Sequence, residues 1–435
     1  MGRRARNLIS LGGSPVHPLQ VSNIEDLSMN RTRPFLSMLR YVSALAALLG
    51  LTLAASAAFA GVRIYVDKDG VGGAPNDSRD RTTASNPATP VATIERGMTL
   101  AIAGDTVLVR AATFVRTSTL GIGKGGIVIK AYPGELAKLD FTGQTSGNGI
   151  NFGADGVTLE GFEITNAAEE GVSTWFTKNN TIRKCHIHHC GLTSGQLAGK
   201  YQNGIAAYGQ YITIEQNLIH DTGSHNVYVY GDHITIRNNV IYRTIGTLDH
   251  GYYGLQIGTP GAACTNITVA HNVFAESINR SSIVFYANNA VVSNVAIVNN
   301  IMIKNPYSPV YVYDDIGSTF TNIQIKNNVF SENGSGNCVY FTSGKGCTTP
   351  PGSFSVSGNL AFSNASLIGF RNLANHDYFP VVGSSLLDRG LAGYATNDFT
   401  GTPRPQGTSA DIGPFEAIGG GGVDAIRPAA IGDLN

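Results

Sequence analysis

Residues 204–217 read GIAAYGQYITIEQN, and this two-part pattern recurs through the following 150 or so residues as NVYVY…HITIRNN, GLQIG…NITVAHN, SIVFY…NVAIVNN, PVYVY…NIQIKNN and CVYFT…FSVSGN. The units close on Asn217, Asn239, Asn272, Asn300, Asn328 and Asn359, which lie 22, 33, 28, 28 and 31 residues apart. Such a spacing indicates a solenoid whose rungs stack while their loops vary. Alternating β-branched residues indicate strands, and equivalent turn asparagines can stack as a ladder. The predicted fold is all-β, a single-stranded parallel β-helix.

The first 60 residues have the pattern of an export signal. An apolar run at 41–57 follows several arginines and ends in Ala58-Phe59-Ala60, which is typical of a cleavable secretory signal. We expect residues 1–60 to be a signal peptide cleaved after Ala60, with Met29 as an alternative true start. The mature protein would then be secreted or periplasmic. The competing interpretation is an N-terminal membrane anchor.

Charge and composition exclude several functional classes. Lys+Arg and Asp+Glu both number 30, so the chain has no basic field to hold nucleic acid or a membrane surface. Charged residues make up 14% and glycines number 53 of 435, which suits a turn-rich β protein. We predict one parallel β-helix domain over 61–418, a Gly-rich linker and C-terminal tail over 419–435, and a monomer.

Cysteine, histidine and aspartate raise the question of bound metals. Cys338 and Cys347 would close a short loop as a disulfide, which export permits. The segment 185–190, CHIHHC, invites a zinc interpretation, but a strand sends alternate side chains to opposite faces, so these groups would not converge on one ion. We interpret it as a plain rung or a disulfide. The loop with Asp67, Asp69, Asn76 and Asp77 could hold a structural Ca²⁺; no other cofactor is predicted.

The start of the mature chain predicts a strand at 62–67 and then a short helix. Thr89 is a suitable N-cap with Pro90 at the first helical position, and apolar residues follow at helical spacing up to Gly104. A short amphipathic helix here would cover the open end of the solenoid.

The same region carries a family resemblance. The segment NPATPVATIERGMTLAIAGDTVLVRAATF (86–114), with SSLLDRG (384–390) and DFTGTPRPQGTSADIGPFE (398–416), resembles the opening and closing of secreted proteins of the pectate-lyase-like, right-handed parallel β-helix superfamily. The resemblance implies a right-handed solenoid over about 62–416, with substrates held on the sheet formed by the first strand of each rung. It does not imply one reaction, since the superfamily includes lyases, hydrolases, epimerases and non-catalytic proteins.

Strand alternation assigns the two faces of that first-strand sheet. Two columns should point inward: Val172, Ile205, Val227, Leu255, Ile283 and Val310, and Ala207, Val229, Ile257, Phe285 and Val312. Two columns should point outward: Trp175, Tyr208, Tyr230, Gly258, Tyr286 and Tyr313, and Ser173, Ala206, Tyr228, Gln256, Val284, Tyr311 and Tyr340. Tyrosine is a good strand residue in its own right. So many aromatics on one exterior face nevertheless favour a platform for sugar rings.

The loops that enter this sheet carry the candidate catalytic residues. A glycosidase needs two carboxylic residues across the bond, and the outward positions hold none; Asp232, Asp249, Asp314 and Asp315 are the nearest. Elimination from a uronic acid polymer needs a base and a group that neutralises the substrate carboxylate. We predict His225 or Lys200 as base and Tyr228 or Tyr253 as acid. We predict that Arg280, with Asn203 or Gln202, binds the substrate carboxylate. His250 borders the same sheet.

The function predicted is therefore a secreted polysaccharide lyase acting on an acidic, uronate-containing polysaccharide. The alternatives are a non-catalytic carbohydrate-binding or surface β-helix, for which the aromatic face would suffice, and a glycoside hydrolase. Neither the calcium-carboxylate cluster of the superfamily nor the Asp-Pro-His-Asp motif of the alginate epimerases occurs in the chain. Convergence of His225, Lys200 and Arg280 over Tyr228 would favour catalysis over binding.

Overall fold

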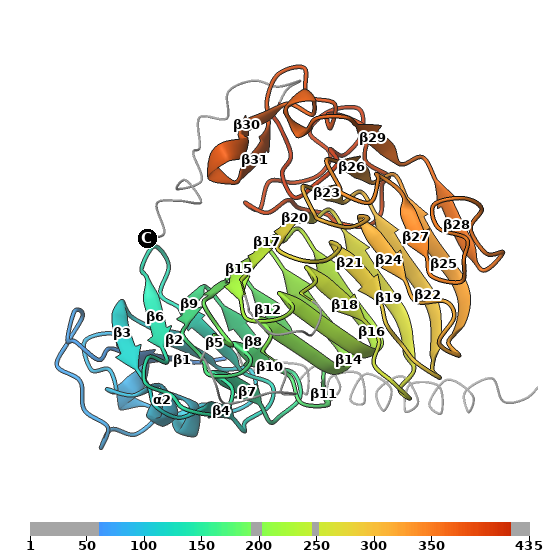
Figure 1. Ribbon diagram of the computed structural model, residues 1–435. Helices are drawn as coiled ribbons and strands as arrows, with labels where there is room; N and C mark the ends of the chain where they lie inside the picture. The colour runs from blue at the N-terminus through green and yellow to red at the C-terminus, as the bar shows by residue number, and fades with distance from the viewer. Residues whose placement is uncertain (1–60, 193–201, 246–251, 419–435) are drawn as a thin grey trace, which may run out of the picture. The chain divides into compact units, whose positions relative to one another are not determined.

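The computed structural model describes residues 61–192, 202–245 and 252–418, which wind into a parallel β-helix (Figure 1). Equivalent strands of successive rungs pair in parallel, and each rung contributes to three sheets, named here first-strand, second-strand and third-strand. The solenoid predicted from the repeating pattern is confirmed. The predicted signal peptide and C-terminal tail lie outside the described residues.

The first-strand and second-strand sheets are continuous because β14 (Ile205–Glu215) and β16 (Val227–Arg237) run through the turn between them. The first-strand sheet also contains β4 (Leu120–Ile122), β7 (Ile150–Phe152), β10 (Val172–Ser173), β18 (Leu255–Ile257), β21 (Ile283–Phe285), β24 (Val310–Val312) and β27 (Val339–Phe341). The second-strand sheet also contains β1 (Arg63–Val66), β2 (Thr106–Val109), β5 (Val128–Ala131), β8 (Thr158–Glu160), β12 (Thr181–Arg183), β19 (Cys264–Ala270), β22 (Val291–Val298), β25 (Thr319–Lys326) and β28 (Phe354–Ser357). The short strand β11 (Thr177–Lys178) pairs with β14 at the turn.

The third-strand sheet closes each rung. It contains β3 (Ala112–Val115), β6 (Ala137–Asp140), β9 (Phe162–Thr165), β13 (His186–His188), β15 (Leu218–Thr222), β17 (Val240–Thr244), β20 (Val273–Ser277), β23 (Ile301–Ile303), β26 (Val329–Ser331) and β29 (Leu360–Phe362). One continuous apolar core fills the space between the three sheets. Its burial is the main favourable term for a fold with so few helices.

An asparagine ladder runs along the turn that follows the second strand. From Asn239 to Asn359, each side-chain oxygen accepts the backbone N–H of the asparagine one rung earlier at 2.9 Å. The side-chain nitrogen donates to the next side-chain oxygen at 2.9–3.0 Å. The N–H of Cys185 donates to the oxygen of Asn217, which confirms that Cys185 occupies the ladder position of its rung.

The N-terminal end is covered by a short helix, α2 (Ile94–Leu100), that packs on β1 and β2. The predicted start at Pro90 was wrong: the N-cap is Thr93, whose hydroxyl oxygen accepts the Arg96 N–H at 3.2 Å. Val91 cannot join the helix because it extends the pairing of β1, with its N–H bound to the Tyr65 carbonyl at 2.9 Å. Within the described ranges, no helix is long and apolar enough to cross a membrane.

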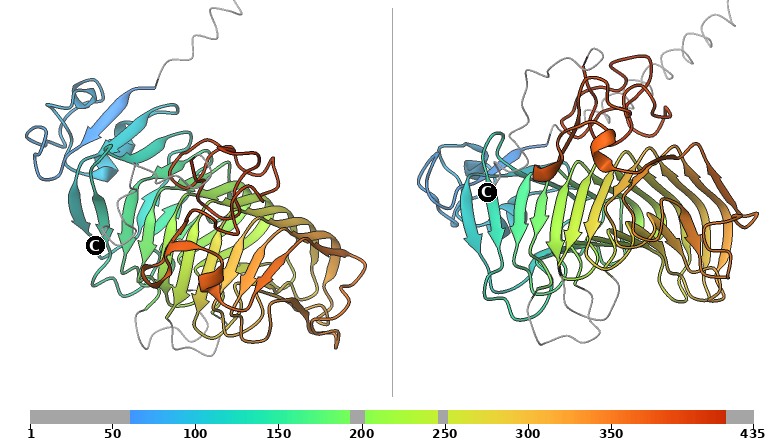
Figure 2. Two further views of the ribbon diagram at one scale, coloured as in Figure 1. Left: turned by 90° about the horizontal axis from the view of Figure 1, so that it is seen from above. Right: turned by 45° about the horizontal axis from the view of Figure 1, so that its top comes forward.

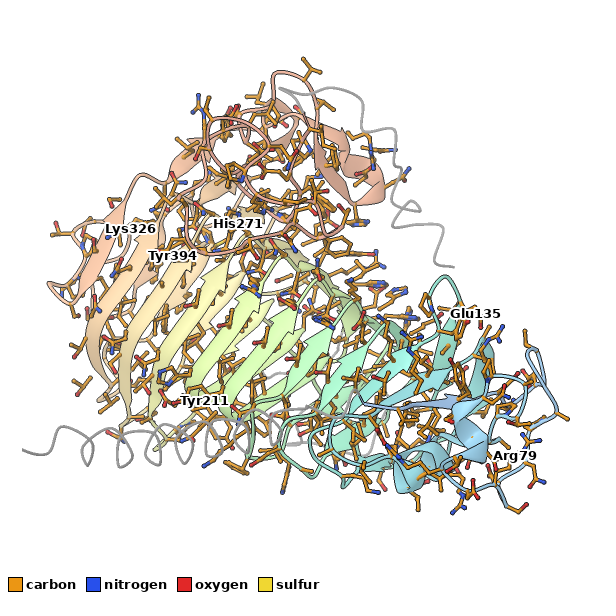
Figure 3. All side chains as sticks on the ribbon, turned by 180° about the vertical axis from the view of Figure 1, so that it is seen from behind. Arg79, Glu135, Tyr211, His271, Lys326 and Tyr394 are labelled. Carbon is orange, nitrogen blue, oxygen red and sulfur yellow. A yellow bond between two sulfur atoms is a disulfide. The ribbon has the colours of Figure 1, made fainter. Side chains whose placement is uncertain are left out.

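The chain after β29 folds back over the third-strand sheet (Figure 2). It contains the 3₁₀ turns η2 (Ala365–Leu367) and η3 (Leu373–Asn375) and the antiparallel pair β30 (Phe370–Asn372) and β31 (Asp377–Pro380); a further turn, η1 (Thr83–Ser85), lies near the N-terminal end. Figure 3 shows the segment that carries Tyr394 lying across the strand ends near His271. Arg404 and Glu416, each only 1% exposed, form a buried ion pair of 2.7 Å in this segment. The third-strand sheet is therefore not an open binding surface over most of its later rungs.

The cysteines and the acidic residues of the N-terminal loop have structural roles. Cys338 and Cys347 form the expected disulfide, while Cys185, Cys190 and Cys264 are free and buried. Among the described residues, no cluster of three or more His, Cys, Asp or Glu side chains is arranged to hold a metal ion. In the loop considered for Ca²⁺, Asp67 accepts two backbone N–H groups, and Asp77 accepts two backbone N–H groups and the Thr93 hydroxyl. Their oxygens stabilise the loop itself.

Candidate functional site

The inward columns of the first-strand sheet lie where the alternation placed them. Ile205 pairs with Val227, Val227 with Leu255 and Leu255 with Ile283. Every residue of both predicted inward columns is fully buried in the core. The opposite side chains of the same strands, which include most of the predicted binding residues, therefore face away from the core.

The outward face is more buried than predicted. Tyr208, Tyr228 and Gln256 are only 4%, 1% and 8% exposed, and Ser173, Ala206 and Val284 are completely buried. Tyr208 folds back along its strand over the small side chain of Ala206 and packs edge-on against Tyr228, with ring centroids 5.5 Å apart. The open platform that we expected is thus wrong for Tyr208 and Tyr228, while Trp175 is exposed and Tyr230 partly exposed. On the later rungs Tyr286, Tyr311, Tyr313 and Tyr340 are partly exposed, and their role in binding stays a prediction.

Phe176 takes the aromatic position that we assigned to Trp175. Its ring lies 6.1 Å from that of Tyr208 and 5.7 Å from that of Tyr230, while Trp175 packs edge-on against Phe176. The prediction assumed a regular strand through residue 175, but both Trp175 and Phe176 have positive φ angles of 36° and 62°. The strand ends in a tight turn there, which shifts the register by one residue. Both rings are largely exposed.

A column of side chains lies two residues before each first strand. In it Asn148 accepts the backbone N–H of Glu170 at 3.2 Å, and Asn203 accepts that of His225 at 3.3 Å. His225 Nδ1 in turn accepts the N–H of Tyr253 at 3.2 Å. These residues sit on consecutive rungs, which are about 4.8 Å apart in a parallel sheet. The column places Glu170, Asn203 and His225 within about 10 Å of one another.

Glu170 is a candidate site residue that the sequence analysis did not identify. It is 5% exposed, and burial raises the pKa of its carboxyl from 4.5 to about 7 despite a hydrogen bond from the Tyr208 hydroxyl at 3.3 Å. Such a carboxyl exchanges protons readily near neutral pH. The available signal was its place directly before Gly171-Val172, which is equivalent to Asn203 before Gly204-Ile205.

His225 is positioned as a hydrogen-bond donor and not as a base. Its ring lies 5.8 Å from that of Tyr228 and 5.5 Å from that of Tyr253, and burial lowers its pKa to about 3. Because Nδ1 accepts the Tyr253 N–H, the neutral ring carries its proton on Nε2. Neither nitrogen is then free to take a proton from a substrate. Asn203 is fully buried, and its side-chain N–H₂ group has no hydrogen-bond partner among the residues that the structure describes.

Of the predicted catalytic residues that the structure describes, Tyr228 and Tyr253 lie beside His225, whereas Arg280 does not. Lys200 and His250 lie outside the described residues. Arg280 lies on the rung two places beyond His225, with its guanidinium 5.5 Å from the centre of the Tyr307 ring. Burial and the neighbouring Tyr313 hydroxyl raise the pKa of Tyr253 well above its usual value. Arg280 is therefore placed beside the later tyrosines rather than over Tyr228.

The predicted binding residues form two aromatic groups along the sheet. The first, named the front group, contains Phe176, Tyr208, Tyr228 and Tyr230. The second, named the rear group, contains Tyr286, Tyr307, Tyr311, Tyr313 and Tyr340. Tyr253 connects them through His225 on one side and Tyr313 on the other. Gln202 is buried, and the Gln256 side chain donates to the Gly258 carbonyl at 3.0 Å.

Other carboxylates near this face already have partners. Asp232 accepts hydrogen bonds from Thr265 and Asn266, which lower its pKa to about 2 against the effect of burial. Asp314 and Asp315 bind the hydroxyls of Thr342 and Ser343. Asp249 lies outside the described residues. Among the carboxyls described at this face, Glu170 is the one whose pKa is raised into the neutral range.

Known proteins share this fold. A family model described as a Pel9A-like right-handed β-helix region matches residues 73–233, and a model of the right-handed β-helix region matches residues 203–376. The solved structure of pectate lyase Pel9A is 16% identical with a TM-score of 0.54, over 82% of this chain and 97% of that one. The A-module of the Azotobacter vinelandii mannuronan C-5 epimerase AlgE6 is 15% identical with a TM-score of 0.42, over 71% of this chain and 93% of that one. No curated protein matches the chain. The two family models and the Pel9A structure confirm the right-handed fold, and at such identity the likeness concerns the fold alone.

Proposed function

The chain is a right-handed parallel β-helix protein that resembles the pectate-lyase-like superfamily, and on that premise we propose that it is a secreted polysaccharide lyase. Its substrate would be an acidic, uronate-containing polysaccharide, cleaved by β-elimination on the first-strand sheet. The observation that carries the proposal is the buried Glu170 carboxyl, with its pKa near 7, bound to the Tyr208 hydroxyl beside an aromatic face.

Glu170 is the proposed base. At neutral pH a large share of Glu170 is ionised, because its pKa is about 7, and it can remove the proton on the carbon next to the uronate carboxylate. The bond from the neighbouring ring carbon to the glycosidic oxygen then breaks, and a carbon–carbon double bond forms. Tyr208 donates its proton to the departing oxygen and recovers one from Glu170 across their 3.3 Å hydrogen bond. Proton transfer is thereby balanced within one pair of side chains.

The developing charge needs hydrogen-bond donors at fixed positions. The side-chain N–H₂ group of Asn203 and the Nε2–H of His225 sit on the two rungs that follow Glu170. In the proposal these two donors bind the substrate carboxylate, and their burial strengthens the interaction. Lys200, which the sequence analysis offered as an alternative base, lies outside the described residues. Tyr228 and the rear group would bind neighbouring sugar units.

Elimination is favoured over hydrolysis by the carboxyl groups at this face. A glycosidase requires a second carboxyl across the scissile bond, about 5–10 Å away. Asp232, Asp314 and Asp315 are held by hydroxyl and amide partners. Within the described part of this face, a single carboxyl with a pKa near neutrality, together with nearby neutral donors, suits the lyase reaction better.

The test is the appearance of the unsaturated uronate product, which absorbs ultraviolet light. The purified protein is mixed with pectate, alginate, hyaluronan and chondroitin, with and without Ca²⁺, and Glu170→Gln is compared with the exposed control Glu95→Gln. We expect absorbance to rise on one polymer with the native protein and the control, and not with Glu170→Gln. New reducing ends without that absorbance would identify a hydrolase, and binding without either product would identify a carbohydrate-binding protein.

A further inference from the structure

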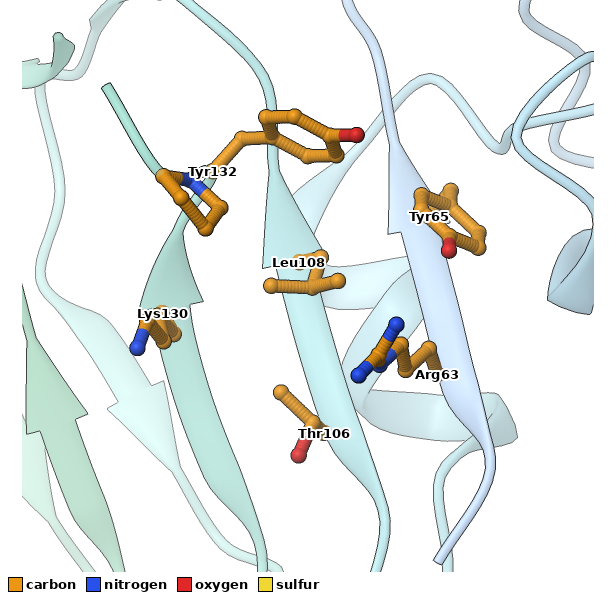
Figure 4. Close-up of a pocket in the computed structure, with 7 residues that line it drawn as sticks. Arg63, Tyr65, Thr106, Leu108, Lys130 and Tyr132 are labelled. Carbon is orange, nitrogen blue, oxygen red and sulfur yellow. The ribbon is translucent and has the colours of Figure 1, made fainter. Parts of the chain in front are cut away.

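A hollow lies on the outside of the second-strand sheet, at the first rungs of the solenoid (Figure 4). It has a volume of about 340 Å³, within the lower part of the roughly 300–1,000 Å³ range of small-molecule sites. Strands β1, β2 and β5 supply its floor, with Leu108 between Tyr65 and Lys130 in one outward column and Arg63 beside Thr106 in the next. It belongs to a different sheet from Glu170.

Two aromatic rings form one end of this hollow. Tyr65 and Tyr132 have ring centroids 6.5 Å apart and are inclined at 44° to each other. The Arg110 guanidinium lies 4.4 Å from the centre of the Tyr132 ring and is itself held by Glu135 at 2.6 Å. Tyr132 is therefore fixed before any ligand arrives, which lowers the entropic cost of binding. Rings next to the apolar Leu108 suit the C–H face of a sugar.

The charge of the hollow is positive. Lys130 contacts Glu160 at 2.8 Å, but Glu160 is also held by Arg183 at 2.7 Å, so two cations share one carboxylate. Within the described part of the chain, no hydrogen bond or ion pair engages the Arg63 guanidinium. The nearby Asp105 is 1% exposed and bound to Arg81. The planar fork of Arg63 is thus available to a carboxylate, which it can bind through two parallel hydrogen bonds.

We propose that this hollow binds one acidic sugar unit of a polysaccharide, as a second carbohydrate site separate from the first-strand sheet. Arg63 would bind the uronate carboxylate, Lys130 would add attraction, and Tyr65 with Tyr132 would contact the sugar ring. A protein without a basic field over its surface would then be anchored to an acidic polymer at a second point, which raises the local concentration of the polymer. This proposal does not rest on catalysis.

The test is the stoichiometry of oligouronate binding by isothermal titration calorimetry. Trigalacturonate and trimannuronate are titrated into Glu170→Gln, which prevents cleavage, and into the same protein with Arg63→Ala or with the exposed control Arg389→Ala. We expect two sites per chain, or one if the first-strand sheet does not bind, and the loss of one site only with Arg63→Ala. The lost site should weaken by at least about tenfold, the usual effect of removing a charged hydrogen bond, and should weaken further with added salt.

Two further measurements determine whether charge decides binding in this hollow. Thr106→Glu places a carboxylate on the floor of the hollow and should abolish the same site by repulsion, with an unchanged melting temperature. Neutral cellotriose should not bind there. Equal stoichiometry and affinity in the Arg63→Ala and Arg389→Ala proteins, or equally tight binding of cellotriose at this site, would overturn the proposal. Failure of the lyase assay would leave this result unaffected.

Discussion

Replacing Asn272 by alanine should destabilise the solenoid far more than its single side chain suggests. The Asn272 side-chain oxygen accepts the Asn239 backbone N–H at 2.9 Å, and its nitrogen donates to the Ile236 carbonyl at 2.9 Å. Both partners belong to the preceding rung, and Asn272 itself is fully buried. Asn272→Ala leaves the buried Asn239 N–H without this acceptor and removes one hydrogen bond to the Ile236 carbonyl, which also lies in the ladder between β16 and β19.

The expected cost follows from those two groups. An unpaired buried donor costs about 1–3 kcal/mol and one lost hydrogen bond about 0.5–1.5 kcal/mol, so the free energy of unfolding should fall by about 1.5–4.5 kcal/mol. The matched control is Asn288→Ala, which removes a partly exposed side chain that makes no hydrogen bond to any described residue. It should change stability by less than about 0.5 kcal/mol.

The assay combines urea unfolding with hydrogen exchange. The urea midpoint should drop in Asn272→Ala and stay in Asn288→Ala, and the Asn239 amide should exchange faster in the first variant alone. Local exchange is informative because rungs of a solenoid can open separately. Equal midpoints for both variants, with a protected Asn239 amide, would refute the idea that the ladder stabilises the turns.

Three further results are expected. Glu416→Gln should lower the free energy of unfolding by about 3–5 kcal/mol because it leaves Arg404 charged and buried; a urea midpoint equal to that of the Glu95→Gln control would contradict this. The buried histidines His186, His225 and His271 have pKa values lowered to about 3, so the unfolded chain binds more protons than the folded protein between pH 3 and about 6.5. The free energy of unfolding should therefore be highest above that range and fall as the pH drops through it, which thermal melting at several pH values would show. Phe176→Ala should weaken oligosaccharide binding without changing the melting temperature, while Leu367→Ala, with a similarly exposed side chain, should change neither; calorimetry that finds unaltered binding would remove Phe176 from the site.

Repetition is what made the fold predictable from sequence. The inward columns, the asparagine ladder and the Cys185 rung all depend on a period of two within strands and a recurring turn. Each rung repeats the same inward and outward pattern, so a wrong assignment at one position is corrected by the equivalent positions of the other rungs. The predicted helix start at Pro90 was wrong because the helix occurs only once and no repeated pattern checks its boundary. Pairing of Val91 with β1 outweighed the local N-cap signal.

The candidate site was less predictable because burial and tautomer are tertiary properties. The sequence placed Tyr208 and Tyr228 on the right sheet, but not the backward fold of Tyr208 over Ala206 that buries them. The chemistry of Glu170 arises from desolvation and the Tyr208 hydroxyl on the next rung. His225 was predicted as a base and is proposed as a hydrogen-bond donor, because its Nδ1 accepts the Tyr253 N–H. None of these contacts joins neighbours in the sequence.

The pH dependence of kcat/KM tests the central claim that Glu170 is the base. The native protein should show an ascending limb near pH 7, the pKa of Glu170, and Glu170→Gln should lose the activity across the whole range. Tyr208→Phe removes a hydrogen bond that lowers this pKa, so any remaining activity should have its limb at higher pH. A limb near pH 4.5 in the native protein, or full activity in Glu170→Gln, would contradict the account.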